Sequence, residues 1–170
     1  MSSNAAVPRR ALVGLGANLG DAAGTLREAQ KAIGRIKGVQ SIQASRFYAT
    51  SPVDAGGPDY VNAVALLETT LAPEALLTEL QTIEKAFGRT RPKGVVNAPR
   101  TLDLDLLRMD GETRETDVLT LPHPRMTGRL FVLVPWLDVE PDAVLPDGRS
   151  VRDAAEALRA SDPSQMIRVL

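Results

Sequence analysis

Two aspartates in the stretch "NAPRTLDLDLL", residues 97–107, have the types and spacing that most directly suggest chemistry. Successive side chains of a β-strand point to opposite faces, so Asp103 and Asp105 share one face while the leucines around them share the other. Carboxylates side by side present hard oxygen ligands, which Mg²⁺ prefers. The pair therefore predicts a magnesium site, although a solvated strand face has the same alternation.

Cations gather just upstream of this pair, in a segment punctuated by proline and glycine. They are Arg89, Arg91, Lys93 and Arg100. Arginine grips phosphate oxygens with two parallel hydrogen bonds, and cations beside a metal site are expected where Mg²⁺ and polyphosphate are neutralised together. Simple surface ion pairing is the alternative, and it would contribute little to stability.

The only histidine, His123, stands between two prolines in "LPHPRM". The flanking prolines stiffen the backbone and help to hold the imidazole in place. The ring could donate to a phosphate oxygen or protonate a leaving group, or it could be an ordinary loop histidine. Arg125 and Arg129 add two cations nearby.

A flat ligand has candidate partners among the few aromatic residues. Tyr48 and Tyr60 bracket a loop rich in proline and glycine, Asn62 shares a strand face with Tyr60, and Phe131 follows His123 by eight positions. Rings of this kind can hold a heterocycle that an amide then reads, although most aromatic residues fill cores.

The stretch "GLGANLG", residues 14–20, is close to a dinucleotide-binding fingerprint. However, no acidic residue ends the following strand, and two strands follow instead of a βαβ repeat, so a Rossmann site is not expected. We expect these glycines to shape a tight turn from strand to helix.

The elements that position these residues alternate in type. Strands are predicted at 10–16, within 39–50, at 60–70 and at 97–107, and amphipathic helices after Asp21 and at 72–88. The order β-α-β-β-α-β is typical of an α+β, ferredoxin-like sandwich, with helices covering an antiparallel sheet. The last 60 or so residues are expected to add a hairpin, a loop, a mixed apolar segment and a short terminal helix.

Length and composition favour one domain over residues 1–170, with 1–8 as a mobile leader. The formal charge of −1 offers no basic field for nucleic acid, and no segment is apolar over the roughly 18 residues that a membrane span needs. The absence of cysteine suits a cytoplasmic protein. A short apolar run after Arg9 and Arg10 is more typical of a buried first strand than of a signal peptide.

The motifs together resemble those of the 6-hydroxymethyl-7,8-dihydropterin pyrophosphokinase family of folate biosynthesis. They are "GLGANLGD", "SPVDAGGPDYVNAV", "GRTR", "APRTLDLDLL", "LPHPRM" and "RLFVLVP", within residues 11–149. The resemblance implies transfer of intact pyrophosphate from ATP to a pterin hydroxymethyl group, with release of AMP.

The resemblance also assigns roles to residues. It implies that Asp103 and Asp105 hold two Mg²⁺ ions bridging the ATP phosphates. It further implies phosphate contacts for Arg89, Arg91, Arg100, His123 and Arg129, nucleotide contacts for Gln81 and Glu84, and pterin contacts for Thr50, Ser51, Pro52, Val53, Tyr60, Asn62 and Phe131. The loops at 49–59 and 89–99 would be lids that exclude water. The implied partners are small molecules, and we expect a monomer.

Two other readings remain open at this stage. One is a catalytically silent, ferredoxin-like nucleotide-binding or regulatory module, against which the intact acidic pair, arginines and stacking residues argue. The other is a Mg²⁺-dependent nuclease, for which the balanced charge provides no basic groove.

Overall fold

A computed structural model describes residues 7–18, 21–50, 60–88 and 102–170. Most of the predicted leader and most of both predicted lids lie outside these ranges. Within them, no helix combines the length and apolar character needed to cross a membrane.

The sheet has the predicted ferredoxin-like topology. The chain runs β1 (Arg9–Ala17), α1 (Ala22–Gly34), β2 (Val39–Ala44), β3 (Tyr48–Thr50), β4 (Tyr60–Thr69), α2 (Pro73–Gly88) and β5 (Asp103–Met109). The strand order is β5-β1-β4-β3-β8, with β2 also paired to β4, and the pairings are antiparallel. The fold class is therefore confirmed.

The strand region predicted within 39–50 is two strands, β2 and β3, on the same side of β4. Ser45 fills the break between them, since its backbone N–H donates to the carbonyl of Val64 (2.8 Å) and its hydroxyl accepts from the Val64 N–H (2.9 Å). The side-chain hydroxyl thus replaces a ladder bond where the strand is interrupted.

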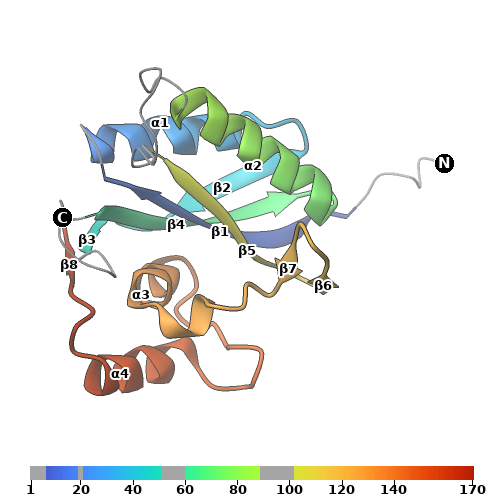
Figure 1. Cartoon of the computed structure of the whole chain (residues 1–170). Coiled ribbons are helices and arrows are strands. Elements are labelled where there is room, and N and C mark those ends of the chain that lie inside the picture. Colours follow the sequence, from blue (N-terminus) through green and yellow to red (C-terminus); the bar gives the residue numbers. More distant parts are fainter. Residues whose placement is uncertain (1–6, 19–20, 51–59, 89–101) are drawn as a thin grey trace.

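One face of the sheet packs against α1 and α2 (Figure 1). The stripe that predicted α1 is buried at Leu26, Ala29 and Ile33, and Asp21 caps the helix by accepting from the Gly24 N–H (3.0 Å). These two helices are the ones that the sequence periodicity predicts.

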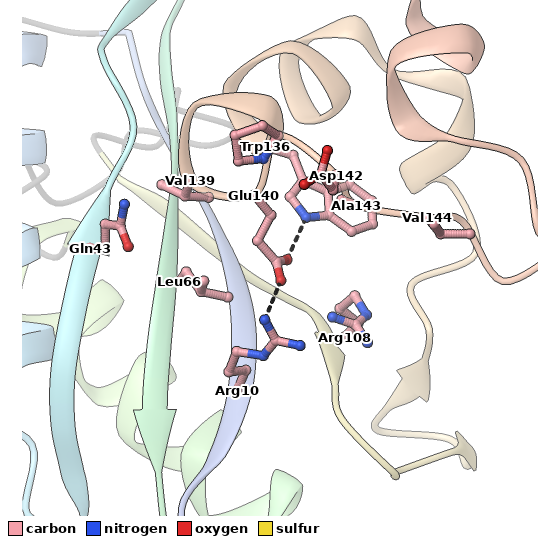
Figure 2. Close-up of a pocket in the computed structure, with 11 residues that line it drawn as sticks. Arg10, Gln43, Leu66, Arg108, Trp136, Val139, Glu140, Asp142, Ala143 and Val144 are labelled. Atoms are coloured by element: carbon pink, nitrogen blue, oxygen red, sulfur yellow. Dashed lines mark hydrogen bonds and ion pairs between the residues drawn. The ribbon is translucent and has the colours of Figure 1, made fainter.

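The opposite face is covered by α3 (Leu130–Val139), and α4 (Val151–Ser161) packs on the side of α3 that faces away from the sheet (Figure 1). The terminal helix was predicted, whereas α3 was expected only as a mixed apolar segment. The side chains of α3 are apolar on most sides of the helix, because the helix is buried on several sides. Its sequence therefore lacks the alternation of polar and apolar residues by which an amphipathic helix is predicted. At its end, Glu140 accepts from the Trp136 indole N–H (2.8 Å) and pairs with Arg10 of β1 (2.9 Å) (Figure 2).

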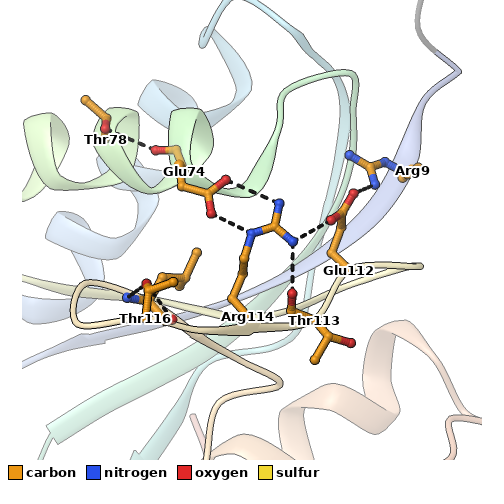
Figure 3. A network of polar contacts seen from close by, with 8 residues as sticks. Arg9, Glu74, Thr78, Glu112, Thr113, Arg114 and Thr116 are labelled. Atoms are coloured by element: carbon orange, nitrogen blue, oxygen red, sulfur yellow. Dashed lines mark hydrogen bonds and ion pairs between the residues drawn. The ribbon is translucent and has the colours of Figure 1, made fainter.

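The predicted hairpin consists of β6 (Arg114–Glu115) and β7 (Thr120–Leu121). Arg114 ties it to α2 through Glu74, and Glu112 joins Arg114 to Arg9 of β1 (Figure 3). After the short 3-10 helix η2 (Met126–Gly128) and the two helices, the strand β8 (Ile167–Val169) pairs with β3 and extends the sheet beyond the predicted elements.

Candidate active site

The β5 strand places the acidic pair on one face of the sheet, as predicted. Asp103 is half-buried and Asp105 is exposed, while Leu102, Leu104 and Leu106 are buried in the core on the other side. In the register with β1, Asp103 lies opposite Gly16 and Asp105 opposite Gly14. Cross-strand partners share a face, so the two glycines lie beside the carboxylates, and the Leu107 side chain and the Asn62 amide approach the positions that glycine side chains would occupy.

Gly14 and Gly16 lie inside β1, so the expectation that they shape a strand-to-helix turn was wrong for these two, while Gly20 lies outside the described residues. The signal in the sequence was their spacing of two, which places both on the acidic face of the sheet. Gly16 also lies opposite Asn62 of β4, and a Cβ atom on Gly16 would lie 2.8 Å from the Asn62 amide nitrogen. The glycine therefore makes room for that amide.

A cleft of about 570 Å³ joins the acidic pair to the segment after the hairpin. Its charged part holds Asp103, Asp105, His123, Arg125 and Arg129, and an apolar part includes Leu77, Leu104, Leu106 and Leu119. Residues of both faces of β5 line the cleft, so it follows the outer edge of that strand. Carboxylates, cations and an apolar wall in one cleft suit a ligand that has both phosphates and a flat base.

His123 is held in the cleft by two hydrogen bonds to backbone groups of neighbouring residues. Its N–H donates to the carbonyl of Leu107 (2.7 Å), and its Nδ1 accepts from the Arg125 backbone N–H (3.1 Å). A ring that accepts at Nδ1 carries its proton on Nε2, which is then the donor available to a ligand. Burial lowers the pKa of His123, the charge of Asp105 raises it, and Arg129 and Arg125 lower it further.

We expect this histidine to titrate below its ordinary pKa of about 6.5 in the protein freed of metal with EDTA. The unfolded chain then binds the proton more tightly than the folded chain. The contribution of His123 to the free energy of unfolding is therefore complete above about pH 6.5 and is lost as the pH falls through the folded pKa. Because the chain has one histidine, its Cε1–H signal in NMR spectra reports the value without assignment. The same signal in urea is the control, and a folded pKa at or above the urea value would contradict the prediction.

Arg129 and Phe131 stand at the beginning of α3. Arg129 is half-buried and occupies the N-cap position of the helix, and its guanidinium carbon lies 5.4 Å from the centre of the Phe131 ring. The Leu130 N–H donates to the Gln165 side chain (2.9 Å), which holds this end of the helix. The first turn of α3 therefore carries both a cation and an aromatic ring at the cleft side of the sheet.

Glu84 of α2 supports the backbone between the two aspartates. Its carboxylate accepts from the Leu104 N–H (2.7 Å) at the outer edge of β5, which is the end strand of the sheet among the described residues. Gln81 is exposed one turn earlier on the same helix. The strand contact of Glu84 was not anticipated, because nothing in the local sequence relates a helix carboxylate to an amide of residue 104.

Three of the residues predicted to contact a pterin, Thr50, Tyr60 and Asn62, lie together on β3 and β4. Thr50 lies opposite Tyr60 in the register, and its hydroxyl donates to the Asn62 side-chain oxygen (2.6 Å). Asn62 is buried, and its amide nitrogen lies 3.5 Å from the carbonyl of Leu15. The helix α3, which bears Phe131, packs across β4 on this same face.

Six predicted site residues lie outside the described residues, so the structure does not place them. They are Ser51, Pro52, Val53, Arg89, Arg91 and Arg100. Within the described ranges, no group of three or more histidine or acidic side chains could hold a metal ion. The acidic pair remains as the donor set, and one or two carboxylates completed by water and substrate phosphates are the usual protein ligands of Mg²⁺.

Fold and cleft together define a ferredoxin-like protein with a carboxylate pair facing a cationic segment, a class suited to metal-assisted transfer of phosphate groups. The sequence profile of the family described as 7,8-dihydro-6-hydroxymethylpterin-pyrophosphokinase (HPPK) matches residues 12–141. The chain belongs to this family. The family membership that the motifs predicted is thus confirmed.

Curated relatives and solved structures agree with this assignment. The 2-amino-4-hydroxy-6-hydroxymethyldihydropteridine pyrophosphokinase of Haemophilus influenzae is 40% identical over 144 residues, which are 84% of this chain and 89% of the relative. The enzyme of the same name from Methylorubrum extorquens is 37% identical over 161 residues, 94% of this chain and 98% of the relative.

The crystal structure of wild-type Plasmodium falciparum HPPK-DHPS with pterin and p-hydroxybenzoate superposes with a TM-score of 0.70 at 13% identity. The match covers 94% of this chain and 45% of the solved chain, so this chain spans less than half of that protein. At this identity the likeness shows the fold alone.

Proposed function

We propose that this chain transfers pyrophosphate from ATP to 6-hydroxymethyl-7,8-dihydropterin in folate biosynthesis and releases AMP. The observation that carries the proposal is the cleft that brings Asp103 and Asp105 together with His123 and Arg129, in a chain whose family is that of the pyrophosphokinase. In the reaction, the hydroxymethyl oxygen bonds to the β-phosphorus of ATP, and the bond from that phosphorus to the bridging oxygen of AMP breaks.

Asp103 and Asp105 would hold two Mg²⁺ ions, which neutralise charge on the transferred phosphates when they are bound. The donor set fits, because both side chains offer oxygen and share a face next to glycines. In-line transfer at phosphorus depends on positioning and charge neutralisation more than on covalent chemistry, so no nucleophilic side chain is required.

The phosphates would be gripped from the cationic side of the cleft. His123 donates from Nε2 to a phosphate oxygen, and Arg129 supplies a positive charge beside it. Arg89, Arg91 and Arg100 are proposed to contact the phosphates from the loop before β5. Gln81 and Glu84 would face the nucleotide from α2, and the apolar wall of Leu77, Leu106 and Leu119 would take its base.

The pterin would lie on the β3–β4 side. Tyr60 and Phe131 are proposed to stack on its ring, while Asn62 and the backbone of residues 50–53 read its edge. The hydrogen bond from Thr50 supports this role of Asn62, because it fixes the side-chain oxygen and so orients the amide. We propose a monomer, since one copy of the chain carries both the acidic pair and the proposed pterin residues. We also propose a cytoplasmic location, which the absence of cysteine suits.

The test is to mix the purified protein with ATP, Mg²⁺ and 6-hydroxymethyl-7,8-dihydropterin and to separate the nucleotides by chromatography. We expect AMP that requires the pterin and disappears when EDTA removes the metal. ADP in place of AMP would mean transfer of a single phosphate. Binding of nucleotide without turnover would instead support a catalytically silent module.

A further inference from the structure

A polar cluster with a buried tyrosine and a surface arginine joins β3 to the end of α3 and has no part in the proposed chemistry. Its centre is Asp138, whose carboxylate accepts from the Tyr48 hydroxyl (2.6 Å), the Arg46 backbone N–H (3.1 Å) and the Arg46 guanidinium (3.1 Å). Arg46 also donates to the Tyr48 oxygen (3.1 Å) and lies 5.7 Å from the centre of its ring. Three donors from one strand segment thus meet one carboxylate of a helix.

The cluster is protected from water on the strand side. Tyr48 is 3% exposed and the Asp138 side chain 16% exposed, whereas Arg46 covers them from the surface. Burial, followed by the hydrogen bond to Asp138, raises the pKa of Tyr48 to about 12. Burial also acts to raise the pKa of Asp138, but the hydrogen bonds from Arg46 and Tyr48 together outweigh it and lower that pKa. The phenol therefore stays protonated and the carboxylate ionised throughout the neutral range, which keeps the short charge-assisted bond in place.

The cluster lies in line with the residues proposed to bind the pterin. On β3, Tyr48 and Thr50 are two positions apart and share the face that meets α3, and Tyr48 lies opposite Asn62 in the register. On α3, Phe131 and Asp138 are seven positions apart, which places them on one side of the helix about two turns from each other. Each element therefore carries a member of the cluster at one end and a proposed pterin contact at the other.

We infer that Asp138 and Tyr48 are positioning residues for the proposed pterin site between α3 and the strands β3 and β4. Their bond sets the separation between α3, which carries Arg129 and Phe131, and the strands that carry Thr50 and Asn62. The inference rests on the proposed function. A slot for a flat ring depends on the distance between its walls, so loosening the far end of α3 weakens stacking at the near end.

The test compares pterin affinity with ATP affinity in Tyr48→Phe, which removes the hydroxyl and keeps the ring. We expect its Kd for 6-hydroxymethylpterin, followed by fluorescence titration, to rise about 5- to 20-fold, since charge-assisted hydrogen bonds are among the stronger ones. The Kd for an ATP analogue with Mg²⁺ should change less than twofold. Asp138→Asn is the second variant, and it should show the same selective loss if Tyr48→Phe does not fold.

Glu140→Gln is the matched control. Glu140 also anchors the end of α3 with a buried aromatic donor and an arginine, but it pairs with Arg10 of β1 (Figure 2) and not with a residue of the cluster. We expect it to lower the melting temperature without changing the pterin Kd. Three outcomes would each overturn the inference. They are equal losses of pterin and nucleotide affinity in the cluster variants, a loss of pterin affinity in Glu140→Gln, and unchanged pterin affinity in the cluster variants.

The binding measurements are independent of turnover. A wild-type protein that binds the pterin but forms no AMP would refute the proposed function and leave the positioning role to be decided by the Kd values. A wild-type protein that forms AMP with unchanged affinities in both cluster variants would refute the positioning role alone.

Discussion

Asp105→Asn is expected to lower kcat for pterin-dependent AMP formation by roughly 10²- to 10³-fold at saturating ATP. The amide has the shape of the carboxylate but no charge, so the metal site loses one of its two anionic donors, and metal assistance is typically worth several kcal/mol in the transition state. Asp105 is exposed, so the folded protein should keep its melting temperature. The measurement is a Mg²⁺ titration of the initial rate, in which the half-saturating concentration should also rise.

Asp110→Asn is the control for this variant. Asp110 follows the same strand at its other end, where it pairs with Arg10 and Arg108 outside the cleft. Its kcat should stay within about twofold of the wild type.

The Asp105 variant has a second readout, because loss of that charge should lower the pKa of His123 further. An Asp105 variant with near-normal kcat would contradict the metal role.

Gly16→Ala is expected to raise the KM for the pterin by about tenfold or more, with little change in the KM for ATP. The new Cβ would lie 2.8 Å from the Asn62 amide nitrogen, so the amide must move. Asn62 is buried and held by Thr50, and a displaced amide leaves buried polar groups without their partners, which costs about 1–3 kcal/mol. Initial rates against each substrate separate the two effects.

Gly14→Ala provides the comparison on the same strand and the same face. Its Cβ would lie 3.5 Å from a methyl group of Leu107, which is an ordinary contact, and no polar group would have to shift. We expect both KM values to remain near those of the wild type. Equal effects of the two alanines would mean that the strand, not the Asn62 amide, is sensitive to an added methyl group.

The elements that sequence alone predicted correctly are those with a local signal. The stripe of α1 repeats every three or four residues and Asp21 caps it, and the alternation of leucine with Asp103 and Asp105 fixes which way β5 faces. Such patterns follow from the geometry of a single element, so no knowledge of its neighbours is needed.

The features that sequence did not predict depend on contacts between distant segments. The helix α3 is apolar on most sides because α4 and the sheet both bury it, and β8 is a three-residue strand defined only by its pairing with β3. The contact of Glu84 with the Leu104 N–H joins a helix to an edge strand, and the space beside Gly16 matters only because Asn62 faces it. In each case the physical cause lies outside the local sequence.

The central position of β1 has a consequence for how the chain folds as it is synthesised. This strand is made first, yet its two neighbours are β4 and β5, and Arg10 meets Asp110 at a separation of 100 residues. At typical rates of about 5–20 residues per second, several seconds pass before β5 exists. During that time the apolar side chains of Leu12 and Val13, which are fully buried in the finished protein, have no complete sheet to enter. Folding of the nascent chain is therefore governed by its most distant contacts and has to wait for β5.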